Sequence, residues 1–189
     1  RRGNEIGHHG YAHLNPSRQT AEGELQELRK GLDALEAVTG ARPKGYRAPA
    51  FDISPRTLEL LVDHGFVYES NQMAWDTPYV HRLKKGRIVE IPFNWLTVDW
   101  TYFAFNFFPP LEYQSGITSQ EDVLDIWSEE FEGLYDDGAL MTIVMHPQVM
   151  GRPSRVRMLG RLIDKMKKKG KVWIAKPIEI AEYWLKETE

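Results

Sequence analysis

Apolar residues recur along this chain at two alternating spacings, which predict an alternation of helices and strands. Three- and four-residue intervals between apolar side chains predict helices over 17–38, 54–65, 119–136, 154–169 and 178–186. Short apolar runs bounded by turn residues predict buried strands over 66–68, 88–91, 140–145 and 172–175. This order is typical of α/β proteins, in which parallel strands joined by right-handed crossovers form a doubly wound sheet or a barrel.

Size and composition narrow the class of protein. The 189 residues predict a single domain over 1–189. The absence of cysteine is compatible with the cytoplasm and leaves only His, Asp and Glu to hold a metal ion. A net charge of −3, with both signs interspersed, predicts no nucleic-acid partner. No apolar run approaches the length of a membrane span, so we expect no membrane contact either.

Two histidines near the start of the chain have metal-ligand spacing. His9 and His13 lie four residues apart. In a helical turn that spacing places both imidazoles on one face, about 6 Å apart between Cβ atoms, and directs His8 elsewhere. The alternative is a polar loop whose histidines are merely solvated.

Other candidates for chemistry follow predicted strands. Arg47, Asp99 and His146 all lie where a strand should end, and Pro147 should hold His146 extended. The alternatives are an arginine in a surface ion pair and a histidine bonded to a neighbouring carbonyl. The aromatic stretch 100–108 suits a core, a contact between copies of the chain or a substrate platform, and it makes a homo-oligomer the expected state.

Taken in order, four of these segments resemble motifs of the polysaccharide deacetylase family, also called the NodB homology or carbohydrate esterase 4 group. The matches are the His-x-x-x-His motif at His9 to His13, the Arg-x-Pro motif at Arg47 to Pro49, the Asp-Trp motif at Asp99-Trp100 and the Leu-x-His motif at Val144 to His146. Segments 89–92 and 145–148 are most similar to the cytoplasmic branch, which includes allantoinase-like, cyclic-imide-hydrolysing and peptidoglycan deacetylase members. The resemblance implies a distorted (β/α) barrel with parallel strands and a cytoplasmic enzyme.

The resemblance also implies an activity. It is that of a metal-dependent hydrolase of non-peptide carbon–nitrogen bonds, which removes N-acetyl groups from the amino sugars of a glycan. His9 and His13 would hold a divalent metal, usually zinc, and His146 would protonate the leaving amine. Asp99 would orient His146, and Arg47 would hold the catalytic base. The substrate-binding residues implied are Pro49, Ala50 through its backbone N–H, Trp100 and Val144.

One family motif has no match. The paired Asp-Asp, which would supply the general base and the third metal ligand, should precede His9, and Asp136-Asp137 comes too late in the chain to replace it. We therefore expect an N-terminally incomplete domain that lacks the first strands of the barrel. Two other functions stay open: hydrolysis of a small cyclic amide or imide, as in allantoinase-like enzymes, and a non-catalytic module that binds a glycan or a partner chain.

Overall fold

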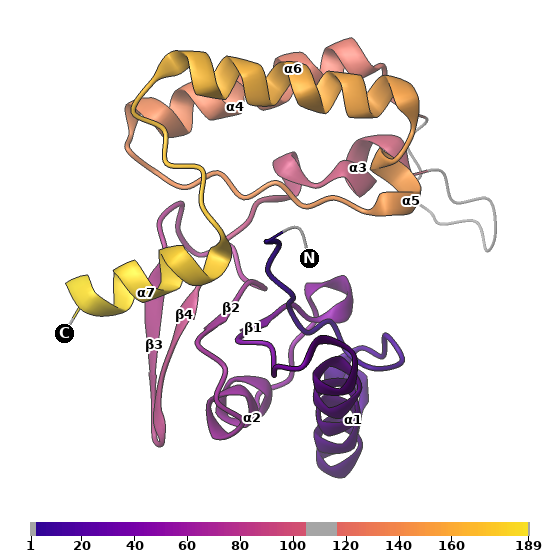
Figure 1. Ribbon diagram of the computed structural model, residues 1–189, viewed down its shortest axis with the longest axis vertical. Helices are drawn as coiled ribbons and strands as arrows, with labels where there is room; N and C mark the ends of the chain where they lie inside the picture. The colour runs from indigo at the N-terminus through magenta and orange to yellow at the C-terminus, as the bar shows by residue number, and fades with distance from the viewer. Residues whose placement is uncertain (1–2, 105–116, 189) are drawn as a thin grey trace. The chain divides into compact units, whose positions relative to one another are not determined.

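The computed structural model describes residues 3–104 and 117–188, which divide into two compact units (Figure 1). One unit comprises Arg1–Pro92 and Ala175–Glu189, and the other comprises Phe93–Ile174. The expectation that residues 1–189 form a single domain stays a prediction. None of the helices in the described ranges has the length and apolar character needed to cross a bilayer.

The first unit contains a four-stranded sheet in the order β1-β2-β4-β3 (Figure 1). The strands are β1 (Gly45–Tyr46), β2 (Tyr68–Glu69), β3 (Tyr79–Leu83) and β4 (Gly86–Glu90). The first two pairings are parallel, while β3 runs antiparallel to β4 at the edge. The α/β class with parallel strands is confirmed, and in the described residues the sheet is open rather than closed into a barrel.

Helices cover this sheet because their apolar faces match its buried side chains. They are α1 (Ala21–Thr39), α2 (Thr57–Asp63) and α7 (Pro177–Glu187), with short 3-10 turns η1 (Pro16–Arg18) and η2 (Pro49–Phe51). Leu28 and Leu32 of α1 pack in one core with Leu61 of α2 and Ile88 of β4. The left-handed Gly40, at φ 80°, ends α1.

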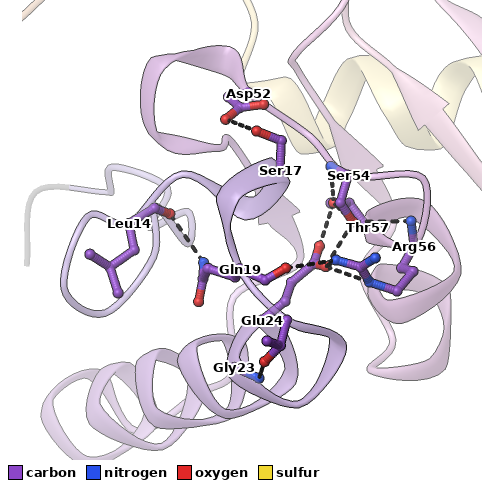
Figure 2. A network of polar contacts seen from close by, with 10 residues as sticks. Leu14, Ser17, Gln19, Gly23, Glu24, Asp52, Ser54, Arg56 and Thr57 are labelled. Atoms are coloured by element: carbon purple, nitrogen blue, oxygen red, sulfur yellow. Dashed lines mark hydrogen bonds and ion pairs between the residues drawn. The ribbon is translucent and has the colours of Figure 1, made fainter.

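A buried carboxylate joins the first turns of α1 and α2 (Figure 2). Glu24 accepts hydrogen bonds from Ser54 Oγ at 2.7 Å and Thr57 Oγ1 at 2.5 Å. It also accepts from Arg56 Nε at 3.2 Å. Because Glu24 is almost fully buried, these donors supply the interactions that water would otherwise provide.

The second unit is built around helices. They are α3 (Asp99–Phe103), α4 (Gln120–Asp136), α5 (Pro147–Met150) and α6 (Pro153–Lys169), with the 3-10 turn η3 (Trp95–Thr97) before α3. Trp127 of α4 and Leu162 of α6 are fully buried members of its apolar core. Ser119 caps α4 by accepting from the backbone N–H groups of Glu121 and Asp122, as its position in the sequence predicts.

The predicted helices are confirmed within a few residues, but two predicted strands are wrong. Segment 140–145 forms only an isolated bridge between Val144 and Val98. Segment 172–175 is not a strand, and Trp173 and Ile174 are each 59% exposed. An apolar run becomes a strand only where a neighbour completes a ladder of backbone hydrogen bonds, and neither segment has one in the described residues.

Candidate functional site

The two candidate metal-ligating histidines lie together in the first unit. The ring centroids of His9 and His13 are 5.0 Å apart, with the rings at 73°. His9 Nδ1–H donates to the backbone carbonyl of Arg47 at 2.7 Å. This bond places the proton of a neutral His9 on Nδ1 and the lone pair on Nε2, which is the usual way in which a protein orients a metal-binding imidazole.

A loop, not a helical turn, brings these rings together. Gly10 and His13 both have left-handed backbones, at φ 78° and 58°, so the helical turn considered for this spacing does not form. Glu27 of α1 shapes the loop, because its carboxylate accepts from the backbone N–H groups of Tyr11 at 3.0 Å and Ala12 at 2.5 Å. The spacing of the histidines indicated the pair but gave no sign of Glu27.

The described residues supply two protein ligands at this pair. Within residues 3–104 and 117–188, three or more His, Cys, Asp or Glu ligands lie close together in one group, Glu69, His81 and Glu90, which does not include His9 or His13. Imidazole nitrogens suit zinc and several other divalent metals, so the donor chemistry fits the implied ion. The metal site at His9 and His13 stays a prediction.

His8 has a structural role, and its ring is directed away from the His9–His13 pair, as the spacing predicts. It is buried, its Nε2–H donates to the Leu28 carbonyl at 3.1 Å, and its Nδ1 accepts from the Gly10 N–H at 3.1 Å. Burial lowers the pKa of His8, so the ring is neutral at pH 7. Both nitrogens are occupied by protein, and a Cβ at Gly31 would lie 2.2 Å from its Nε2.

Arg47 projects from the end of β1 and is fixed by the next strand segment. Its Nε donates to the Ser70 carbonyl at 3.0 Å, and its Nη2 donates to Ser70 Oγ at 2.5 Å. The guanidinium carbon also lies 5.6 Å from the centre of the Phe51 ring. Ser70 therefore sets the direction of the guanidinium, while the role of Arg47 in holding a catalytic base stays a prediction.

The turn after Arg47 carries backbone strain. Ala50 and Phe51 have φ angles of 54° and 57°, a region that costs a residue with a side chain roughly 1–2 kcal/mol. The Ala48 N–H donates to Asn71 Oδ1 at 2.7 Å and holds the segment. Pro49 is buried and Ala50 is exposed. The two backbone bonds of this turn are donated by Phe51 and Asp52, so neither uses the Ala50 N–H that the resemblance assigns to an oxyanion.

In the second unit, Asp99 and His146 form a tightly bonded pair. His146 Nδ1 lies 2.6 Å from Asp99 Oδ1, and the His146 backbone N–H donates to Asp99 Oδ2 at 2.7 Å. Asp99 is fully buried, whereas the His146 side chain is 32% exposed. His146 is extended before Pro147, as predicted. The carboxylate thus holds the proton on Nδ1 and leaves Nε2 as the nitrogen that can exchange a proton with a substrate.

Trp100 and Val144 lie beside this pair. The Trp100 ring centroid is 5.0 Å from that of His146, and the indole is 44% exposed. Val144 is buried, its carbonyl accepts from the Asp99 N–H at 3.0 Å, and its N–H donates to the Thr97 carbonyl at 3.0 Å. Val144 therefore positions Asp99 through its backbone, and pocket lining by both side chains stays a prediction. Of the aromatic stretch 100–108, residues 105–108 lie outside the described residues.

Comparisons with known proteins show which proteins this chain is similar to as a whole. The family model for polysaccharide deacetylase matches residues 1–68. A peptidoglycan deacetylase of Helicobacter pylori is 33% identical over 211 residues, which cover 97% of this chain and 71% of that protein. Among solved structures, a protein of Mycobacterium smegmatis assigned to the polysaccharide deacetylases has a TM-score of 0.92 at 33% identity, over 98% of this chain and 64% of that one. The Puue allantoinase has a TM-score of 0.82 at 25% identity, over 96% of this chain and 59% of that one. The chain therefore spans less than two thirds of both solved structures.

Proposed function

Because this chain belongs to the polysaccharide deacetylase family, we propose that it works as a hydrolase of amide bonds other than peptide bonds and removes N-acetyl groups from the amino sugars of a glycan. The observation that carries the proposal is the Asp99–His146 pair, a histidine with one nitrogen bonded to a buried carboxylate and its side chain partly exposed. Amide cleavage needs such a group, since an amine leaves only after it gains a proton.

His146 is the proposed general acid. Its Nε2 protonates the departing sugar amine, and the imidazolium that carries this proton is stabilised by the Asp99 carboxylate at 2.6 Å. The two bonds from one carboxylate to the ring and the backbone of His146 fix both the direction and the tautomer of the imidazole. Trp100, in contact with the ring, would form part of the sugar-binding surface.

His9 and His13 are the proposed metal ligands, and zinc is the proposed metal. Bound there, a divalent ion would polarise the acetyl carbonyl and activate water. The bond from His9 Nδ1–H to the Arg47 carbonyl places the lone pair on Nε2, the nitrogen that would bind that ion. Arg47 would position the catalytic base, the Ala50 N–H would bind the oxyanion, and Pro49 and Val144 are further proposed substrate-binding residues.

Replacement of His146 by alanine tests the proposal. In the complete, zinc-loaded protein, we expect His146→Ala to lower the rate of acetate release from N-acetylglucosamine oligomers at least a hundredfold, the contribution typical of a general acid. His64→Ala, which removes a histidine that caps α2, is the matched control and should retain activity. An unchanged rate in the His146 variant, with the fold intact by circular dichroism, would refute the assignment.

Cyclic amide hydrolysis is the second candidate, favoured by the similarity to the Puue allantoinase. The same preparation should therefore be assayed with allantoin and with cyclic imides, whose ring opening needs the same protonation of nitrogen. Calorimetric titration with glycan fragments completes the comparison, because binding without turnover of any substrate would favour a non-catalytic module.

Cytoplasmic location and self-association form part of the same proposal. The cysteine-free composition supports the first, and the aromatic residues around Trp100 support the second. Light scattering from the protein as it elutes from a size-exclusion column would measure its mass. A monomer at micromolar concentration would refute the proposed self-association.

A further inference from the structure

A second group of potential metal ligands lies within the sheet of the first unit. Glu69 ends β2 and Glu90 ends β4, and the two residues are register partners on adjacent parallel strands. His81 comes from β3, which pairs with β4. Both glutamates are completely buried. Because a buried carboxylate is costly unless its charge is compensated, two of them side by side need a proton or a cation between them.

Distances within this group fit a small cation. One ligand atom from each of Glu69, His81 and Glu90 can be chosen so that all lie within 4.8 Å of one another. Glu69 Oε1 and His81 Nε2 are 3.4 Å apart, which is long for a hydrogen bond. Two ligands at about 2.0–2.1 Å from a tetrahedral zinc ion lie about 3.3–3.4 Å apart, so this separation matches an edge of such a site.

The side chain of Gln72 lies beside two of these potential ligands, Glu69 and His81. Gln72 Nε2 lies 2.9 Å from Glu69 Oε1 and 3.0 Å from His81 Nε2. Because the Gln72 amide nitrogen can donate a hydrogen bond to His81 Nε2, the lone pair of Nε2 points toward the Gln72 amide. Rotation of the Gln72 amide by half a turn would place its carbonyl oxygen at the position of the amide nitrogen, where it could serve as a fourth ligand.

An independent feature is an oxygen of Glu90 with no donor. Its Oε1 accepts from the backbone N–H groups of Asn71 at 3.0 Å and Gln72 at 3.1 Å. Its Oε2 is buried and has no hydrogen-bond donor among the described residues. Burial, reinforced by the Glu69 carboxylate, raises the pKa of Glu90 to about 11. A cation bound between the two carboxylates would give Glu90 Oε2 the partner that it lacks among the described residues.

We propose that Glu69, His81 and Glu90 bind a divalent transition-metal ion of the zinc type, at a site separate from the His9–His13 pair. A neutral imidazole and two carboxylates are ligands of intermediate hardness that such ions accept. Carboxylates bind a metal in their ionised form, so binding displaces any proton held between them, and two negative charges balance two positive ones. Because its glutamate ligands are buried, the site is structural: it ties the β3–β4 hairpin to β2.

The test starts from a His9→Ala/His13→Ala variant, which removes the other candidate ligands and makes the result independent of the proposed hydrolase activity. After removal of metal with a chelator and dialysis, zinc is titrated into the protein by calorimetry, and bound zinc is counted by elemental analysis. We expect one equivalent of zinc per chain, release of protons on binding and a higher unfolding temperature with zinc than without. Uptake of no zinc by this variant would overturn the proposal.

Ligand variants in the same background locate the site. His81→Asn and Glu90→Gln should each weaken zinc binding at least a hundredfold, while the control His64→Ala should leave it unchanged. Circular dichroism of metal-free protein checks that each variant is folded, and cobalt absorption in the unsubstituted His81 protein gives a second readout of tetrahedral coordination. Equal zinc affinity in the His81 and control variants would refute the site. A different result is also informative: the protein takes up no zinc, and Glu90→Gln makes it more stable. That result would show that the two carboxyl groups share a proton instead of a metal ion.

Discussion

The sharpest consequence of the structure concerns Asp99, whose two oxygens have different partners on His146. In Asp99→Asn one oxygen becomes an amide NH2 group of almost the same size. If the remaining oxygen still accepts from the His146 backbone N–H, the NH2 group faces Nδ1. Nδ1 must then accept, so the proton of the neutral ring moves to Nε2 and the imidazolium loses its counter-charge.

The expected loss follows from that charge. Attraction between a carboxylate and an imidazolium about 4 Å apart between charge centres is about 4 kcal/mol at an effective dielectric constant of about 20. Solvent reaches the His146 side chain, which is 32% exposed, and reduces this value. We therefore expect kcat for acetate release to fall between about a hundredfold and a thousandfold, at 1.36 kcal/mol for each factor of ten.

Two measurements check the reasoning. The first compares kcat of Asp99→Asn with that of Asp125→Asn, an exposed aspartate on α4 whose change should leave turnover within a factor of two. The second records the nitrogen chemical shifts of His146, which should switch from the Nδ1–H to the Nε2–H form whether or not the substrate has been identified. A fall smaller than tenfold in kcat, or an unchanged tautomer, would refute the role given to Asp99.

Three further predictions concern stability. Glu24→Ala removes the shared acceptor in Figure 2 and should lower the free energy of unfolding in urea by about 3–5 kcal/mol, whereas the exposed Glu22→Ala should cost less than about 1 kcal/mol. The pKa of His8 is lowered by burial from 6.5, so the unfolded chain binds a proton that the folded chain excludes. This contribution to stability is constant above about pH 6.5 and declines as the pH falls, and the decline should be shallower in His8→Gln when thermal unfolding is followed between pH 7 and 5. Gly45→Ala places a Cβ 1.9 Å from the Tyr68 ring, and it should destabilise the protein by at least about 2 kcal/mol, or the overlap is relieved by a movement visible in its crystal structure.

Helices were predictable here because their signals are local. The periodic leucines of α1, the Ser119 cap of α4 and the left-handed Gly65 after α2 all act within a few residues of the element that they define. Strands depend on neighbours that sequence spacing does not reveal. The polar hairpin strand β3 was therefore missed, and the apolar run 140–145 was predicted as a strand although it makes one bridge.

The candidate site shows the same difference between what is local in sequence and what depends on distant partners. Residue type and motif order indicated His9, His13, Asp99 and His146, and the structure brings each pair into contact. The groups that hold Arg47 and the histidine loop were not predictable, because Glu27, Ser70 and the Arg47 carbonyl act across 15 to 38 residues of chain. Glu69 and Glu90 also stand out in the sequence, because they occur beside apolar strand residues, where a charged side chain is rarely buried without a partner.

A comparison of His8, His9 and His146 shows how the partner, not the residue type, decides the chemistry open to an imidazole. His8 uses both nitrogens on backbone groups and is left with neither a proton nor a lone pair to offer. His9 donates Nδ1–H to a neutral carbonyl, which fixes a lone pair on Nε2 without favouring the charged ring, as a metal ligand requires. His146 donates the same proton to a buried carboxylate, which provides a counter-charge for the imidazolium formed in catalysis. With a neutral acceptor in place of Asp99, the imidazolium of His146 would lose its counter-charge, and His146 should therefore protonate the leaving amine less effectively.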